Sequence, residues 1–218
     1  MLSFNNSHNN PYRKSPTRKR RKKECNESEG EDATAISTPS CNPYLPSILP
    51  QLRKFQREAY DFATTTTNPS NEISTKLLLA DEMGLGKSVT SLSVMTHYYN
   101  EWPLLILCPA SLRYTWPAEI EKFLPTLPSQ SIYVVQGFED VSFAWKRCNV
   151  NIVVASYSLL QKRAAAARAL QDFGFKCVIA DESHNLKQKN SQRCELAMPI
   201  LKKAKRLLLL SGTPALAR

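Results

Sequence analysis

Short, continuous runs of apolar residues recur along the chain from residue 51 onward. Six of these runs predict β-strands, at residues 76–80, 104–108, 132–136, 151–155, 176–180 and 206–210. Their apolar positions follow one another without alternation, which is typical of strands that are buried on both faces of a parallel sheet. The pattern therefore favours a buried parallel sheet over a half-exposed antiparallel one.

Longer, mixed segments separate most of these runs. Four of them predict helices, at residues 87–100, 111–123, 157–171 and 191–201. An alternation of strand and helix produces βαβ units, and these build an open α/β sheet. We therefore expect an α/β fold with a mainly parallel sheet and helices on both faces.

The first 50 residues have a different composition. Asn, Ser, Pro and charged residues dominate, and large apolar residues are sparse up to residue 40, so this segment cannot build a core. We predict a disordered tail at residues 1–50 and a folded domain at residues 51–218. Residues 13–23 carry eight positive charges in eleven positions. This block predicts a nuclear localisation signal, although a solvated run of charge is the alternative.

Charge points to an acidic partner. The 218 residues carry a net charge of +10, and residues 51–218 alone hold 21 basic and 14 acidic residues, so the folded part is basic as well. Such a balance favours nucleic acid as a partner. No apolar run approaches the roughly 18 residues of a membrane span, so we expect neither a membrane protein nor a secreted one. The six cysteines show no metal-binding spacing and are expected to be reduced thiols.

The strongest chemical signal follows the first predicted strand. Gly84 and Gly86 allow the backbone to wrap a phosphate, and a helix that begins at Lys87 directs its positive end there. Lys87 would reach the outer phosphates, and the Ser88 hydroxyl would bind Mg²⁺. Asp81 stands where the general phosphate-loop pattern has Gly. A structural turn is the alternative interpretation.

A second signal closes the predicted strand at residues 176–180. Asp181 and Glu182 place two carboxylates at the C-terminal edge of the sheet, where ligands of α/β proteins bind. Asp181 can hold Mg²⁺, and Glu182 can orient and deprotonate an attacking water. Taken with the phosphate loop, they predict one metal–triphosphate site with Lys87, Asp181 and Glu182 as its catalytic residues.

Three motifs in this order resemble a known family. Residues 81–88 (DEMGLGKS), 181–184 (DESH) and 211–214 (SGTP) resemble motifs I, II and III of superfamily-two helicases. More narrowly, they resemble SWI/SNF-type DNA translocases, whose motif I carries Asp-Glu at the position of Asp81. Residues 101–106, 111–116 and 204–206 are similar to the annealing-helicase branch, which rewinds DNA at replication forks. The resemblance covers residues 52–218.

The resemblance implies a RecA-like lobe that binds ATP and Mg²⁺. Gln56 would read adenine, and the nucleotide-binding loop would comprise Asp81, Glu82, Met83, Gly84, Leu85, Gly86, Lys87 and Ser88. Residues that would contact the DNA backbone or couple it to hydrolysis are Pro109, Ser111, Ser156, Tyr157, His184, Ser211, Gly212 and Thr213. A cluster that could lie near DNA comprises Lys187, Lys189, Arg193, Lys202, Lys203, Lys205 and Arg206.

The family implies a second RecA-like lobe that supplies arginine fingers, and this chain stops shortly after motif III. We therefore expect an ATP-dependent annealing helicase of DNA repair or fork restart, represented by its first lobe, with forked DNA as partner and a nuclear location. A finger contributes about 10³ to 10⁵ in rate, so we expect little turnover from this chain alone. The alternatives are a chromatin-remodelling ATPase, a non-hydrolysing nucleotide- and DNA-binding fragment, and, less compatible with Gln56 and motif III, a small-substrate kinase.

Overall fold

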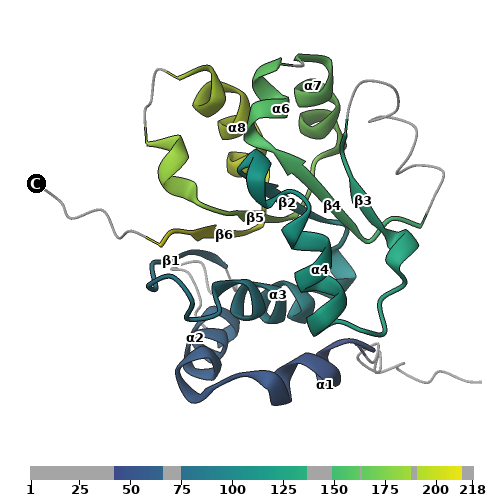
Figure 1. Ribbon diagram of the computed structural model, residues 1–218, viewed down its shortest axis with the longest axis vertical. Coiled ribbons are helices and arrows are strands. Elements are labelled where there is room, and N and C mark those ends of the chain that lie inside the picture. Colours follow the sequence, from purple (N-terminus) through teal and green to yellow (C-terminus); the bar gives the residue numbers. More distant parts are fainter. Residues whose placement is uncertain (1–41, 66–74, 137–148, 163, 188–190, 213–218) are drawn as a thin grey trace, which may run out of the picture. The chain divides into compact units, whose positions relative to one another are not determined.

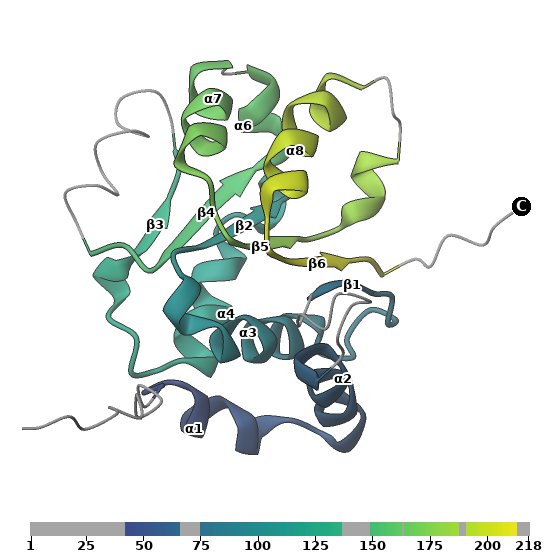
Figure 2. The same ribbon diagram turned by 180° about the vertical axis from the view of Figure 1, so that it is seen from behind.

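A computed structural model describes residues 42–65, 75–136, 149–162, 164–187 and 191–212 of the chain. The basic block at residues 13–23, and with it the predicted localisation signal, lies outside the described residues, as does most of the predicted tail. Figures 1 and 2 show the described part from opposite sides.

A single sheet of six strands forms the centre of the fold (Figure 1). Its spatial order is β1-β6-β5-β2-β4-β3, and all five neighbouring pairs are parallel. The strands are β1 (Lys76–Leu79), β2 (Leu104–Cys108), β3 (Ile132–Val134), β4 (Ile152–Ser156), β5 (Cys177–Ala180) and β6 (Arg206–Leu210). Each predicted strand is present to within two residues at either end, and the predicted parallel sheet is confirmed.

Helices cover both faces of the sheet, as predicted (Figures 1 and 2). On one face lie α1 (Leu45–Ile48), α2 (Lys54–Thr65), α3 (Lys87–His97) and α4 (Thr115–Phe123). On the other face lie α6 (Tyr157–Lys162), α7 (Ala164–Phe173) and α8 (Gln192–Lys203). Short 3₁₀ turns are η1 (Leu49–Gln51), η2 (Tyr99–Glu101), η3 (Ala110–Leu112), η4 (Ser129–Ser131) and η5 (Ser183–Leu186). None of the helices in the described ranges is long and apolar enough to cross a bilayer.

The continuous apolar runs are explained by two cores, one on each face of the sheet. In β2, Leu104, Ile106 and Cys108 pack against the α1–α4 side, whereas Leu105 and Leu107 pack against the α6–α8 side. Successive side chains of a strand point to opposite faces, so a strand covered on both sides needs apolar residues at every position. All five residues of β2 are fully buried.

The predicted boundary of the tail at residue 50 is too late. Tyr44 and Ile48 lie in the core on the α3 side, with Ile48 fully buried, and the Tyr44 ring packs edge-on against Tyr99 at 5.0 Å. The Oδ1 atom of Asn42 accepts a hydrogen bond from the backbone N–H of Tyr44 at 3.1 Å and so fixes the start of α1. The helix is too short for its periodicity to be seen in the sequence.

Two further boundaries differ from the sequence prediction. The single helix expected at residues 157–171 is two helices, α6 and α7, and the helix expected from residue 111 starts only at Thr115, after the turn η3. Apolar periodicity marks the buried face of a helical segment, but it does not reveal where along that segment one helix ends and another begins.

The register of the sheet aligns the C-terminal ends of four strands. Leu79 of β1 pairs with Leu210 of β6, and Ala180 of β5 lies between Leu209 of β6 and Leu107 of β2. The segments that follow these strands therefore leave the sheet at one edge. This edge gathers residues 81–88, 109–113, 181–184 and 211–212.

The opposite edge holds a buried ion-pair network. Both oxygens of Glu101 accept hydrogen bonds from Arg206, at 3.0 and 3.1 Å, and Lys205 lies 3.0 Å from the same carboxylate. The Arg206 guanidinium also lies over the Tyr98 ring, 4.0 Å from its centroid. Arg206 is buried and pairs with Glu101 at the strand N-termini, so its side chain does not belong to a DNA-facing surface, whereas Lys205 is exposed.

Glu101 makes stability depend on pH. Burial by itself would raise the pKa of Glu101, but hydrogen bonds and charge from Arg206 and Lys205 outweigh it and hold that pKa below its ordinary value of 4.5. A carboxylate whose pKa is depressed by folding stabilises the folded state above its ordinary pKa. That contribution is lost as the pH falls through the depressed value.

Glu101→Gln should lower the free energy of unfolding by about 2 kcal/mol at pH 7, since it removes a charge-assisted hydrogen-bond acceptor from buried Arg206. Denaturant unfolding at pH 7 and at pH 3 measures this. The difference in the free energy of unfolding between this variant and the parent chain should be smaller at pH 3 than at pH 7. The matched control, Asp61→Asn, breaks the exposed Arg57–Asp61 pair, which spans 3.2 Å, and should cost only a few tenths of a kcal/mol. Equal losses for the two variants would contradict the assignment.

Candidate functional site

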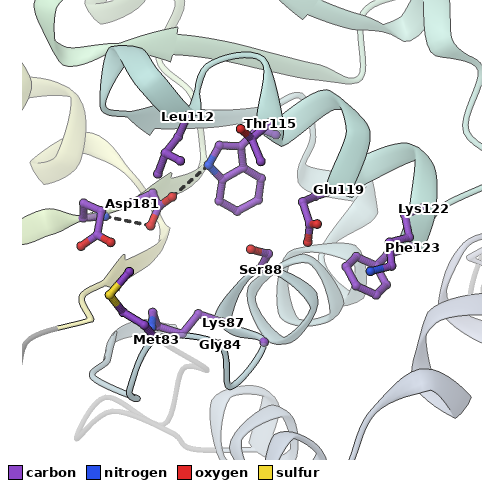
Figure 3. Close-up of a pocket in the computed structure, with 13 residues that line it drawn as sticks. Met83, Gly84, Lys87, Ser88, Leu112, Thr115, Glu119, Lys122, Phe123 and Asp181 are labelled. Atoms are coloured by element: carbon purple, nitrogen blue, oxygen red, sulfur yellow. Dashed lines mark hydrogen bonds between the residues drawn. The ribbon is translucent and has the colours of Figure 1, made fainter.

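One pocket of about 440 Å³ lies at the aligned edge of the sheet (Figure 3). The phosphate loop forms one wall, α4 forms the opposite wall, and the end of β5 closes it. Its lining residues are Met83, Gly84, Gly86, Lys87, Ser88, Leu112, Thr115, Trp116, Glu119, Lys122, Phe123, Asp181 and Glu182. The two chemical signals found in the sequence therefore meet in one place.

The phosphate loop has the backbone that its glycines permit. Gly84 and Gly86 both have positive φ, at 84° and 80°, and α3 begins directly after Gly86. The Lys87 ammonium donates hydrogen bonds to the carbonyl oxygens of Asp81, at 2.8 Å, and Glu82, at 2.9 Å. In this state the lysine folds back onto its own loop, so binding an anion requires it to exchange these carbonyls for the anion.

Gln56 lies behind the loop and is not among the residues that line the pocket. Its Oε1 accepts from the backbone N–H of Arg53 at 2.8 Å, which caps the start of α2, and its Nε2 donates to the carbonyl of Leu85 at 2.8 Å. The side chain is buried, with 4% of its surface exposed. Gln56 thus ties α2 to the phosphate loop, and its predicted contact with adenine stays a prediction.

Asp181 is held on all sides at the end of β5. Its Oδ2 accepts from the indole N–H of Trp116 at 3.0 Å, and its Oδ1 accepts from the backbone N–H of Glu182 at 2.8 Å (dashed lines in Figure 3). Burial raises the pKa of Asp181, while these two hydrogen bonds and the charge of Lys87 act in the opposite direction. A carboxylate in such a setting gains from a cation beside it.

Glu182 has a strained backbone, with φ 47° and ψ 49°, in the left-handed region that non-glycine residues seldom adopt. The carbonyl of Glu182 accepts from the Asn185 side-chain N–H at 2.9 Å, and Oε2 of Glu182 lies 3.0 Å from Nδ1 of His184. Glu182 lines the pocket beside Asp181, and the predicted coupling residue His184 lies against this predicted base.

Motif III lies between the other two motifs, because β6 lies between β1 and β5. Ser211 is buried and its backbone N–H donates to the carbonyl of Leu79 at 3.0 Å. A Cβ placed on Gly212 would lie 3.8 Å from both Lys87 Nζ and Glu182 Oε1. Gly212 therefore lies close to both Lys87 and Glu182, Ser211 is bonded to the end of β1, and Thr213 lies outside the described residues.

The residues expected to contact DNA divide into two groups. Ser111 is exposed and Pro109 is half-buried, both in the segment after β2. Ser156 and Tyr157 are buried and their side chains bond within the fold, so their predicted contact with DNA stays a prediction. Ser156 Oγ accepts from the Leu159 backbone N–H at 3.3 Å at the start of α6, and the Tyr157 hydroxyl donates to the Asp181 carbonyl at 2.8 Å.

The wall formed by α4 was missed in the sequence. Five of its residues, spaced three or four apart or adjacent, line the pocket, namely Thr115, Trp116, Glu119, Lys122 and Phe123. This spacing follows one face of a helix, but the same spacing serves any buried face. Only the partner of the indole N–H distinguishes Trp116 from an ordinary core residue.

The loop glycines allow a matched test of the Gln56 contact. A Cβ on Gly86 would lie 2.4 Å from Nε2 of Gln56, whereas a Cβ on Gly174, also at positive φ, meets nothing within 4 Å. Both Gly86→Ala and Gly174→Ala should lose about 1 kcal/mol of stability to backbone strain. Gly86→Ala should lose at least a further 1 kcal/mol, because Gln56 must give up a buried hydrogen bond. Thermal unfolding of the two variants measures the difference, and equal stabilities would exclude the clash.

The chain is similar in sequence to DNA annealing helicases. It is 40% identical over 177 residues to human DNA annealing helicase and endonuclease ZRANB3. The aligned residues make up 80% of this chain and 16% of that protein. It is 39% identical over 172 residues to the Xenopus laevis SWI/SNF-related matrix-associated actin-dependent regulator of chromatin subfamily A-like protein 1, covering 78% of this chain and 16% of that protein. The chain thus matches about a sixth of the length of these relatives.

Solved structures share the fold. The Sulfolobus solfataricus SWI2/SNF2 ATPase core in complex with dsDNA superposes with a TM-score of 0.58 at 25% identity, over 75% of this chain and 32% of that one. The Pyrococcus furiosus Hef helicase domain has the same fold, with a TM-score of 0.57 at 20% identity, over 78% of this chain and 34% of that one. Residues 17–217 match the model of the SNF2-related domain. The chain belongs to the SNF2-related domain family.

Proposed function

We propose that this chain is the nucleotide-binding lobe of an ATP-dependent DNA translocase of the annealing-helicase type. The observation that carries the proposal is the convergence of the phosphate loop, Asp181 and Glu182 on one pocket. The similarity to annealing helicases supports the finer assignment to repair or fork restart, and with it a nuclear location.

The residues of the pocket fit Mg²⁺ and a triphosphate. Backbone N–H groups of the loop and the N-terminus of α3 suit phosphate oxygens, and Lys87 supplies a mobile positive charge. The Ser88 hydroxyl and the Asp181 carboxylate are hard oxygen ligands of the kind that Mg²⁺ prefers. When bound, the metal would neutralise charge that develops on the phosphates.

Within this site Glu182 has the geometry of a proton acceptor. It lines the pocket next to Asp181, and its carboxylate is oriented by the nearby His184 ring, 3.0 Å away. We propose that Glu182 takes the proton of the attacking water, that Asp181 holds the metal, and that His184 with Gly212 transmits motion between Glu182 and the end of β6. Trp116 and Tyr157 fix Asp181 from α4 and α6.

Lys87→Ala should weaken Mg²⁺–ATP binding at least tenfold, about 1.4 kcal/mol, because it removes the charge that faces the phosphates. Calorimetry with a slowly hydrolysed ATP analogue measures the affinity. Glu182→Gln is the matched comparison, since it removes a proton acceptor and no metal ligand, and should bind nearly as the parent chain does. Asp181→Ala should lose the Mg²⁺-dependent part of the affinity. Equal binding by the parent chain and the Lys87 variant would refute the site.

We propose that DNA approaches the same edge of the sheet, at the exposed segment after β2. The support is the exposure of Ser111, the net charge of +10, and the dsDNA with which the Sulfolobus solfataricus ATPase core is in complex. Contacts at this place would go to phosphates, since helix N-termini and hydroxyl groups recognise phosphate and not base sequence. A forked duplex, the DNA structure on which an annealing helicase would act, is our first choice of ligand.

Ser111→Asp should weaken DNA binding by roughly fivefold at low salt, because a new negative charge near a phosphate costs about 1 kcal/mol in water. Ser129→Asp is its control. It adds the same charge to the exposed turn η4, which precedes β3 and so lies at the opposite edge of the sheet. Fluorescence anisotropy with forked and unforked duplexes of unrelated sequence measures both, and the salt dependence should fall by roughly 0.9 for each phosphate contact that is lost. A larger loss for Ser129→Asp would place DNA on the other edge.

A further inference from the structure

The indole of Trp116 makes a hydrogen bond that packing alone does not explain. Trp116 is buried, with 2% of its surface exposed, and its Nε1–H donates to Oδ2 of Asp181 at 3.0 Å, across 65 positions of sequence. A buried indole N–H usually finds a partner, and a backbone carbonyl would serve. Here the partner is the carboxylate that we assign to the metal.

The backbone of Asp181 is already fixed without Trp116. Its N–H donates to the carbonyl of Leu107 at 2.7 Å, and its carbonyl accepts from the hydroxyl of Tyr157, a residue with 1% of its surface exposed, at 2.8 Å. The remaining freedom of Asp181 is the orientation of its carboxylate. Oδ1 is held by the backbone N–H of Glu182 at 2.8 Å, so the bond from Trp116 to Oδ2 completes the restraint.

Trp116 itself sits on a rigid support. It lies in the first turn of α4, and Ile120 of the same helix is fully buried in the same core. It also lines the pocket together with Asp181, so it borders the space that a ligand of Asp181 would enter. The indole cannot follow the carboxylate if the carboxylate turns.

We propose that Trp116 is a positioning residue that orients the Asp181 carboxylate for Mg²⁺. This inference rests on the proposed nucleotide site and names a residue of that site that lies outside motifs I, II and III. Groups that orient a metal ligand from outside contribute about 10- to 100-fold to metal affinity, because they hold the ligand in its binding orientation before the metal arrives. Trp116 would act through Asp181 and would not need to touch the nucleotide.

The test is ADP binding by the full 218-residue chain, measured by calorimetry in Mg²⁺ and in EDTA. Trp116→Phe retains an aromatic ring and removes the N–H, so it should weaken ADP binding about tenfold in Mg²⁺ and leave the affinity in EDTA unchanged. Trp102→Phe is the matched control. The Trp102 indole also donates a hydrogen bond, to the carbonyl of Met95 at 2.8 Å, but Trp102 does not line the pocket, and its loss should leave both affinities unchanged.

A second measurement reads Trp116 without replacing it, in case Trp116→Phe does not fold. The chain has three tryptophans, Trp102, Trp116 and Trp145, the last outside the described residues. With Trp102 and Trp145 changed to Phe, Trp116 is the only indole. Its emission should shift when Mg²⁺ and ADP are added together, because the metal draws on the carboxylate that accepts its N–H, and should stay constant with ADP in EDTA.

The outcomes separate this inference from the proposed function. No ADP binding by the parent chain in Mg²⁺ would reject the proposed site itself. Mg²⁺-dependent binding that Trp116→Phe and Trp102→Phe leave equally intact would reject the positioning role and keep the site. An equal loss for Trp116→Phe in Mg²⁺ and in EDTA would mean that the indole contacts the nucleotide, which also overturns the inference, as would an emission of the single indole that Mg²⁺ and ADP do not change.

Discussion

The parallel register of the sheet is the constraint on which the site depends. Because Leu78, Leu209, Ala180 and Leu107 lie in one row across β1, β6, β5 and β2, the loops that follow these strands emerge at a common edge. A slip of one residue between two strands would turn every side chain of the slipped strand to the opposite core. The two separate apolar cores prevent such a slip, so burial far from the pocket fixes the distances within it.

Two half-buried carboxylates, Glu101 and Asp181, have different roles in this fold. At the N-terminal edge, both oxygens of Glu101 accept hydrogen bonds from the Arg206 guanidinium, which neutralises the charge of the carboxylate. At the C-terminal edge Asp181 receives hydrogen bonds from neutral donors, Trp116 and a backbone N–H, that restrain its carboxylate but do not cancel its charge. A half-buried carboxylate whose charge is not cancelled is suited to a cation.

The sequence predicts the sheet, and it predicts that the loop at residues 81–88 and the Asp181–Glu182 pair lie together, because each depends on a local pattern. Continuous apolar runs identify strands covered on both faces, and the two glycines before Lys87 mark a loop whose backbone can wrap a phosphate. Trp116 and the placement of Tyr157 could not be predicted, since both act through partners distant in sequence. Helix α1 was not predicted for a different reason. Its four residues are too few to show a periodic pattern, and only the fold shows that Ile48 is in the core.

The position of β1 in the sheet gives the pocket walls of unequal stiffness. Among the described strands β1 pairs only with β6, and Leu78 is 58% exposed, whereas β5 is flanked by β6 and β2 and is buried throughout. Strand edges with few buried contacts open more easily than central strands. The phosphate loop therefore follows a strand at the edge of the sheet, which opens more easily. Asp181 and Glu182 follow a central strand, which is held on both sides. A ligand that contacts both the phosphate loop and Asp181 would link β1 to β5 and so reduce the local opening of β1.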